Sequence, residues 1–85
     1  MSTNKNSLEY AMNTNLLKSV RVKNGKTQTD MASLIEKSID TYAKKERGEV
    51  YFTPAEMVRV SRTLNLTFSE FNDIFFNSEL QFCNF

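Results

Sequence analysis

Three short capping signals divide this chain into helices. Each is a threonine followed three residues later by a carboxylate, and they lie at Thr27–Asp30, Thr53–Glu56 and Thr67–Glu70. A hydroxyl and a carboxylate at this spacing satisfy the free backbone amides at the start of a helix. Pro54 strengthens the second signal, because proline suits the first position of a helix. The chain is therefore expected to consist largely of short helices.

Apolar residues at helical spacing complete this pattern. We expect one helix over residues 15–23 that stops at Asn24-Gly25, a second after Thr27, and a third over residues 39–46 that is capped by Ser38. Two more helices follow Thr53 and Thr67. Their expected core residues are Met57, Val58, Val60, Leu64, Phe68, Phe71, Ile74 and Phe75. Two glycines and one proline in 85 residues are too few turn residues for a β-sandwich, so the predicted fold class is all-α with five short helices.

The composition of the two ends differs from that of the middle. Residues 1–12 are mostly Ser, Thr, Asn and Lys and are predicted to be a mobile arm, whereas residues 13–76 are predicted to be the folded domain. Residues 77–85 form an aromatic tail with Leu80, Phe82 and Phe85. This tail is expected either to pack back on the domain or to join two copies of the chain.

Several function classes are excluded by composition. The chain has no histidine, and its single cysteine, Cys83, can form neither an internal disulfide nor a metal cluster. No nucleophile constellation or cation-binding loop is present, so we expect no catalytic residues, no metal and no cofactor, and the protein is not expected to be an enzyme. Apolar runs of at most three residues predict no membrane span, and we expect a cytoplasmic protein.

Charge is distributed unevenly along the chain. Residues 14–50 carry eight basic and five acidic residues, whereas the remainder carries three basic and five acidic residues. The net charge of +1 conceals this difference. A basic first half favours a polyanionic partner, although a solvated surface explains the same excess.

The stretch from about residue 15 to residue 76, most of the chain, resembles a known family. The matching pattern reads Gly25-x-Thr27-Gln28-x-x-x-Ala32-x-Leu34, Ser38-x-x-Thr41-Tyr42-x-Lys44-x-Glu46-x-Gly48, Phe52-Thr53-x-x-Glu56 and Leu64-Asn65-Leu66-Thr67-x-x-Glu70-x-x-x-Ile74-Phe75. It is similar to the phage repressor and Cro-like (XRE-type) DNA-binding domains, and Lys45-Glu46-x-Gly48-x-x-x-Phe52-Thr53 is similar to small regulators of Gram-positive temperate phages. The resemblance implies a lambda-repressor-like domain in which two helices form a helix-turn-helix unit.

The same resemblance implies roles for individual residues. Arg21 and Glu46 match a structural ion pair that joins the first helix to the end of the recognition helix, and Ala32 matches a close helix crossing. Glu36-Lys37 stands where the family has glycine and an apolar residue, so we expect a wider or strained turn there. The candidate DNA-binding residues are Gln28, Lys37, Ser38, Ile39, Asp40, Thr41, Ala43, Lys44 and Arg47.

Base-edge chemistry separates these candidates. Lys44 can donate to guanine, Asp40 acts only as an acceptor and can accept from cytosine N4, and Ile39 and Ala43 can contact thymine methyl groups. Lys37, Lys44 and Arg47 are placed to meet phosphates. The implied function is a transcriptional regulator of a phage or prophage in a bacterial host cell, which occupies double-stranded operator DNA as a homodimer formed through the C-terminal helix and tail. The alternative is an antirepressor that binds a partner repressor instead of DNA, which Glu36 and Asp40 favour.

Overall fold

The computed structural model describes residues 12–76, and in this part of the chain it contains five helices and no strand. The helices are α1 (Thr14–Lys23), α2 (Gln28–Leu34), α3 (Ile39–Glu46), α4 (Pro54–Thr63) and α5 (Phe68–Phe76). The predicted all-α fold is therefore confirmed. Residues 1–11 of the predicted arm and the whole predicted tail lie outside the described residues, whereas Met12 packs against the core.

All three predicted capping boxes are present. The Thr27 hydroxyl accepts from the Asp30 amide at 3.0 Å, and the Asp30 carboxylate accepts from the Thr27 amide at 2.8 Å. The same reciprocal pair of hydrogen bonds begins α4 at Thr53 and α5 at Thr67. Ser38 caps α3 as predicted, since its hydroxyl accepts from the Thr41 amide at 3.1 Å. The helix starts are thus determined by side chains within four residues of each other.

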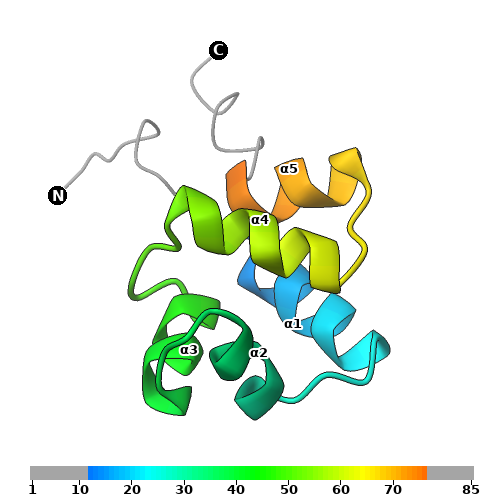
Figure 1. The fold of residues 1–85 in the computed structure, drawn as a ribbon. Helices are drawn as coiled ribbons and strands as arrows, with labels where there is room; N and C mark the ends of the chain where they lie inside the picture. The colour runs from blue at the N-terminus through cyan, green and yellow to red at the C-terminus, as the bar shows by residue number, and fades with distance from the viewer. Residues whose placement is uncertain (1–11, 77–85) are drawn as a thin grey trace, which may run out of the picture.

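The helices are arranged so that α2 and α3 lie side by side at one end of the molecule (Figure 1). The helix α1 contacts both α3 and α5, and α2 also contacts α4. The chain enters α1 beside the end of α5, where the Asn13 amide donates to the carbonyl of Ile74 at 2.9 Å. The helices α1 and α4 therefore pack against one side of the α2–α3 unit, and α5 packs against α1.

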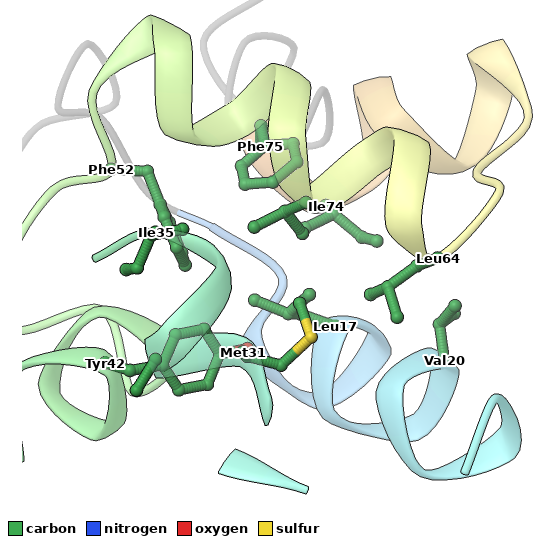
Figure 2. Packing of buried hydrophobic residues seen from close by; sticks show 11 residues of the cluster. Leu17, Val20, Met31, Ile35, Tyr42, Phe52, Leu64, Ile74 and Phe75 are labelled. Atoms are coloured by element: carbon green, nitrogen blue, oxygen red, sulfur yellow. The ribbon is translucent and has the colours of Figure 1, made fainter. Parts of the chain in front are cut away.

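The core is formed by apolar side chains from all five helices. Figure 2 shows Leu17 and Met31 pointing toward Ile74, and all three are fully buried. Aromatic rings extend the core toward α3, where Tyr42 and Phe52 pack edge to face with centroids 6.1 Å apart. Ala32 is also buried in α2, the helix that packs against α3.

Two of the expected core residues are wrong. Val58 and Phe68 are exposed, with 42% and 83% of their surface accessible. Val58 precedes the buried Val60 by two positions, which places it on a different side of α4. Phe68 is the first residue of α5, and the buried residues of that helix are Ile74 and Phe75 at its other end. Hydrophobicity alone did not distinguish the two faces at these positions.

The turn between α2 and α3 contains a strained residue, as expected from the sequence. Glu36 has a φ of +61°, in the left-handed region that favours glycine.

We predict that Glu36→Gly raises the free energy of unfolding by about 0.5–1 kcal/mol, since removal of the Cβ relieves more strain than the added chain entropy costs. A thermal melt followed by circular dichroism measures this gain. Asn65→Gly is the matched control, because Asn65 has a φ of +53° but asparagine tolerates this region. A larger gain at Asn65 than at Glu36 would contradict the prediction.

Candidate nucleic-acid interface

The helix α3 presents a mixed surface to solvent. Ile39 is half-exposed, Asp40 and Lys44 are exposed, and Thr41 and Ala43 are partly buried. The Ser38 hydroxyl also donates to the hydroxyl of Thr41 at 2.9 Å, which orders the first turn of the helix. This outward face contains the residues predicted to meet base edges.

The opposite face of α3 carries the expected ion pair with α1. Arg21 Nε lies 2.6 Å from Glu46 Oε2, and a second bond from Arg21 Nη2 to Glu46 Oε1 measures 3.2 Å. The two side chains are only 9% and 5% exposed. Arg21 also donates to the carbonyl of Lys26 at 2.8 Å. A bidentate pair of this kind fixes both distance and orientation, so the end of α3 is held against α1.

Two further donors complete the shell around the Glu46 carboxylate. The Tyr42 hydroxyl donates to Oε2 at 2.8 Å, and Gln28 Nε2 donates to Oε1 at 3.0 Å. Gln28, one of the candidate DNA-binding residues, thus ties the first residue of α2 to the last residue of α3. We call Arg21, Gln28, Tyr42 and Glu46 the Glu46 network. It joins three helices through one carboxylate.

The ionisation of the Glu46 network follows from these contacts. Burial on its own would raise the pKa of Glu46, but the hydrogen bonds from Arg21, Gln28 and Tyr42 lower it below the ordinary value of 4.5. Burial and the neighbouring carboxylate raise the pKa of Tyr42, so its hydroxyl stays a donor. Since the pKa of Glu46 is lower in the folded chain, the carboxylate contributes stability above pH 4.5 that is lost as the pH falls through the folded value.

Lys45 is a residue whose place the sequence reasoning missed. Its side chain is 6% exposed, and Nζ lies 2.8 Å from Glu56 Oε1 and 2.9 Å from the carbonyl oxygen of Tyr51. The ammonium also lies 5.8 Å from the centre of the Phe52 ring. The available signal was the spacing of Tyr42, Lys45 and Glu46, which is that of one buried helix face.

Glu56 thereby has two roles. Its carboxylate caps α4 through the Thr53 amide and also accepts from the buried ammonium of Lys45. Burial acts to raise the pKa of Glu56, but the hydrogen bonds from Lys45 and Thr53 lower it below its usual value. Consecutive residues at the end of α3 are therefore attached to different helices, with Glu46 bound to α1 and α2 and Lys45 bound to α4.

Two of the three predicted phosphate-binding cations have carboxylate partners within the protein. Lys44 Nζ lies 3.3 Å from Asp40 Oδ2, and Arg47 Nε lies 2.6 Å from Glu49 Oε2. Hydrogen bonding to Arg47 lowers the pKa of Glu49. Lys37 is exposed, and within residues 12–76 no carboxylate approaches it to salt-bridge distance. The surface around α3 is thus less basic than a count of lysines and arginines indicates.

An open pocket of about 280 Å³, lined by residues with polar side chains, lies where three helix ends meet. Its wall includes Lys18 of α1, Gln28 of α2 and Arg47 after α3. Lys18 is exposed and was not among the predicted site residues. Because Arg47 is paired with Glu49 and the Gln28 amide donates to Glu46, the exposed Lys18 is the group at this edge that can meet an anion such as a phosphate. The remaining lining residues are Thr14, Asn15 and Glu46.

Two features are absent from the described part of the chain. None of the helices within residues 12–76 is long and apolar enough to cross a lipid bilayer. The same residues contain no group of three cysteine, aspartate or glutamate side chains that could hold a metal ion.

A family model described as helix-turn-helix (HTH_3) matches residues 17–71, which is more than half of the chain. Comparisons with curated proteins and with solved structures gave no match. The matched residues begin in α1, include all of α2, α3 and α4, and end in α5. The chain therefore belongs to the XRE-type helix-turn-helix family, which consists of DNA-binding regulatory domains.

Proposed function

We propose that this protein is a repressor or Cro-like regulator of a temperate phage or prophage, and that it acts by occupying an operator. The observation that carries the proposal is the Glu46 network, which fixes α3 while its other face stays in solvent. A helix held in this way can enter the major groove without a large loss of conformational freedom. The phage assignment rests on the similarity of the segment from Lys45 to Thr53 to small phage regulators.

In the proposed complex, α3 lies in the major groove with its first turn toward the base edges. Asp40 and Lys44 face the bases, while Lys37, Arg47 and Lys18 meet phosphates on either side of the groove. Occupying the site excludes polymerase from the overlapping promoter. The mechanism is steric, and it requires neither a cofactor nor a chemical step.

The second candidate function is an antirepressor that binds a repressor protein. The pairing of Lys44 with Asp40 and of Arg47 with Glu49 favours it, because a surface with neutralised cations attracts a polyanion less strongly. A basic partner protein would meet the carboxylates of these pairs. The two functions differ in one simple respect, since an antirepressor does not bind DNA on its own.

The proposal is tested by fluorescence anisotropy with duplexes that tile the DNA flanking the gene, at two salt concentrations. We expect the affinity to fall steeply as salt rises, and Lys37→Ala and Arg47→Ala each to reduce the slope of log K against log salt by about 1. Lys23→Ala is the control, because Lys23 lies beside Leu64 and Glu70, away from α3. No binding to any duplex would overturn the proposal and favour the antirepressor.

We also propose that the protein binds its operator as a two-fold dimer formed through α5 and the C-terminal tail. Phe68 supports this arrangement, since the first residue of α5 exposes 83% of its surface. A two-fold pair would place its recognition helices about 34 Å apart, one turn of DNA.

Sedimentation of the full chain with and without operator tests the dimer. Phe68→Ser should weaken the dimer. Val22→Ser also replaces an exposed apolar residue, but it lies on α1, so this control should leave the dimer unchanged. A monomer at tens of micromolar, even with operator present, would exclude it.

A further inference from the structure

The exposed face of α3 carries an acceptor and a donor side by side. Asp40 Oδ2 and Lys44 Nζ lie 3.3 Å apart, one helical turn from each other. Their side chains are 76% and 46% exposed, so both polar ends are accessible to a ligand. Asp40 is the second residue of α3, in the first turn of the recognition helix. This is the part of a helix-turn-helix unit that meets base edges.

We propose that Asp40 and Lys44 act as a unit that selects one G·C base pair in each half-site. The inference rests on the proposed DNA-binding function and specifies the sequence that the site prefers. In the major groove, guanine presents two neighbouring acceptors, N7 and O6, and cytosine presents the N4 donor next to them. The Lys44 ammonium can donate to the two guanine acceptors, while the Asp40 carboxylate accepts from cytosine N4.

The spacing of the two groups fits this edge. Guanine O6 and cytosine N4 are joined by a Watson–Crick hydrogen bond, so they are separated by about 2.9 Å. The donor and acceptor of the protein pair are separated by a similar 3.3 Å. One protein pair can therefore lie against one base pair, with each of its polar ends opposite a complementary atom.

An A·T pair does not match in the same way. Its donor, adenine N6, lies between two acceptors, adenine N7 and thymine O4. A carboxylate placed on N6 would face acceptors on both sides, and only one of them could receive the ammonium of Lys44. The Asp40 carboxylate thus disfavours binding to an A·T pair as well as favouring binding to a G·C pair. Unfavourable contacts with the wrong partner increase specificity in the same way as favourable contacts with the right one.

The pair also adds little affinity for DNA of arbitrary sequence. A carboxylate and an ammonium in contact carry no net charge, so together they attract phosphates weakly. Lys44 is therefore assigned to base reading and Lys37 to the phosphate backbone. This division predicts that changing Asp40 alters which sequence is bound, and not simply how tightly DNA is held.

The test is selection of binding sites from a randomised duplex library, using the full chain, Asp40→Asn and Glu49→Gln. The parent should select a G·C pair at one position of each half-site, with a preference over A·T of about ten- to a hundredfold. Asp40→Asn should move the preference at that position to A·T, because asparagine pairs with adenine N6 and N7. Glu49→Gln removes the same charge from the loop and should leave the selected sequence unchanged.

The outcomes separate this inference from the function on which it rests. If the parent and Asp40→Asn both bind DNA and select the same base at every position, the assignment of the pair is wrong and the DNA-binding function stands. If the parent enriches no sequence and fails to bind any duplex, the proposed function is wrong as well. A shift confined to one position in each half-site supports the assignment.

Discussion

Glu46→Ala is expected to lower the free energy of unfolding by about 3–5 kcal/mol, the usual cost of removing one partner from a buried ion pair. The substitution leaves the Arg21 guanidinium buried without its carboxylate, and it also deprives Gln28 and Tyr42 of an acceptor. A domain of this size has a total stability of about 5–15 kcal/mol, so the loss is a large fraction of it. Urea denaturation followed by circular dichroism measures the change.

Two comparisons show whether the loss comes from the buried charge. Arg21→Met combined with Glu46→Leu removes both charges and should destabilise less than Glu46→Ala alone. Glu49→Ala removes a carboxylate from a pair that is half exposed, and its unfolding midpoint should stay close to that of the parent. A double variant less stable than the single one would show that the network does not act through the ion pair.

Lys45→Ala is expected to lower the free energy of unfolding by about 3 kcal/mol, because the buried Glu56 carboxylate loses its cation. The neighbouring Lys44→Ala is the matched control, since it removes the same side chain from an exposed pair on the other face of α3. Thermal melts of the two variants compare them directly. Equal effects of the two lysines would contradict the assignment of Lys45 to a structural role.

The sequence predicted the helices well because helix starts are local. Thr27, Thr53 and Thr67 each bind a carboxylate only three residues away, so no tertiary contact is needed to recognise them. The strained turn at Glu36 was recognisable for a similar reason, as the departure from glycine in the resemblance already located it. The exposure of Phe68 depends on the packing of α5 against the other helices. Its hydrophobicity alone therefore led to the wrong prediction that it lies in the core.

The sequence predicted which residues belong to the candidate site better than it predicted the ion pairs that they form. Both partners of the Arg21–Glu46 pair were identified through the resemblance. The pairing of Arg47 with Glu49 depends on the shape of the loop after α3, because residues two apart do not face each other on a helix. Lys45 was counted with the other basic residues of the segment 14–50, although burial beside Glu56 removes it from the interface.

We propose that DNA binds to the surface formed by α3 and the adjoining helix ends. The most direct measurement is an NMR titration of the isotope-labelled full chain with the duplex that binds most tightly in the anisotropy assay. We expect the largest changes in chemical shift for the backbone amides of residues 37–47 and of Gln28. The side-chain resonances of Lys44 and Arg47 should shift as well. If the duplex is bound and the amide chemical shifts of α3 stay unchanged, α3 does not form the DNA interface.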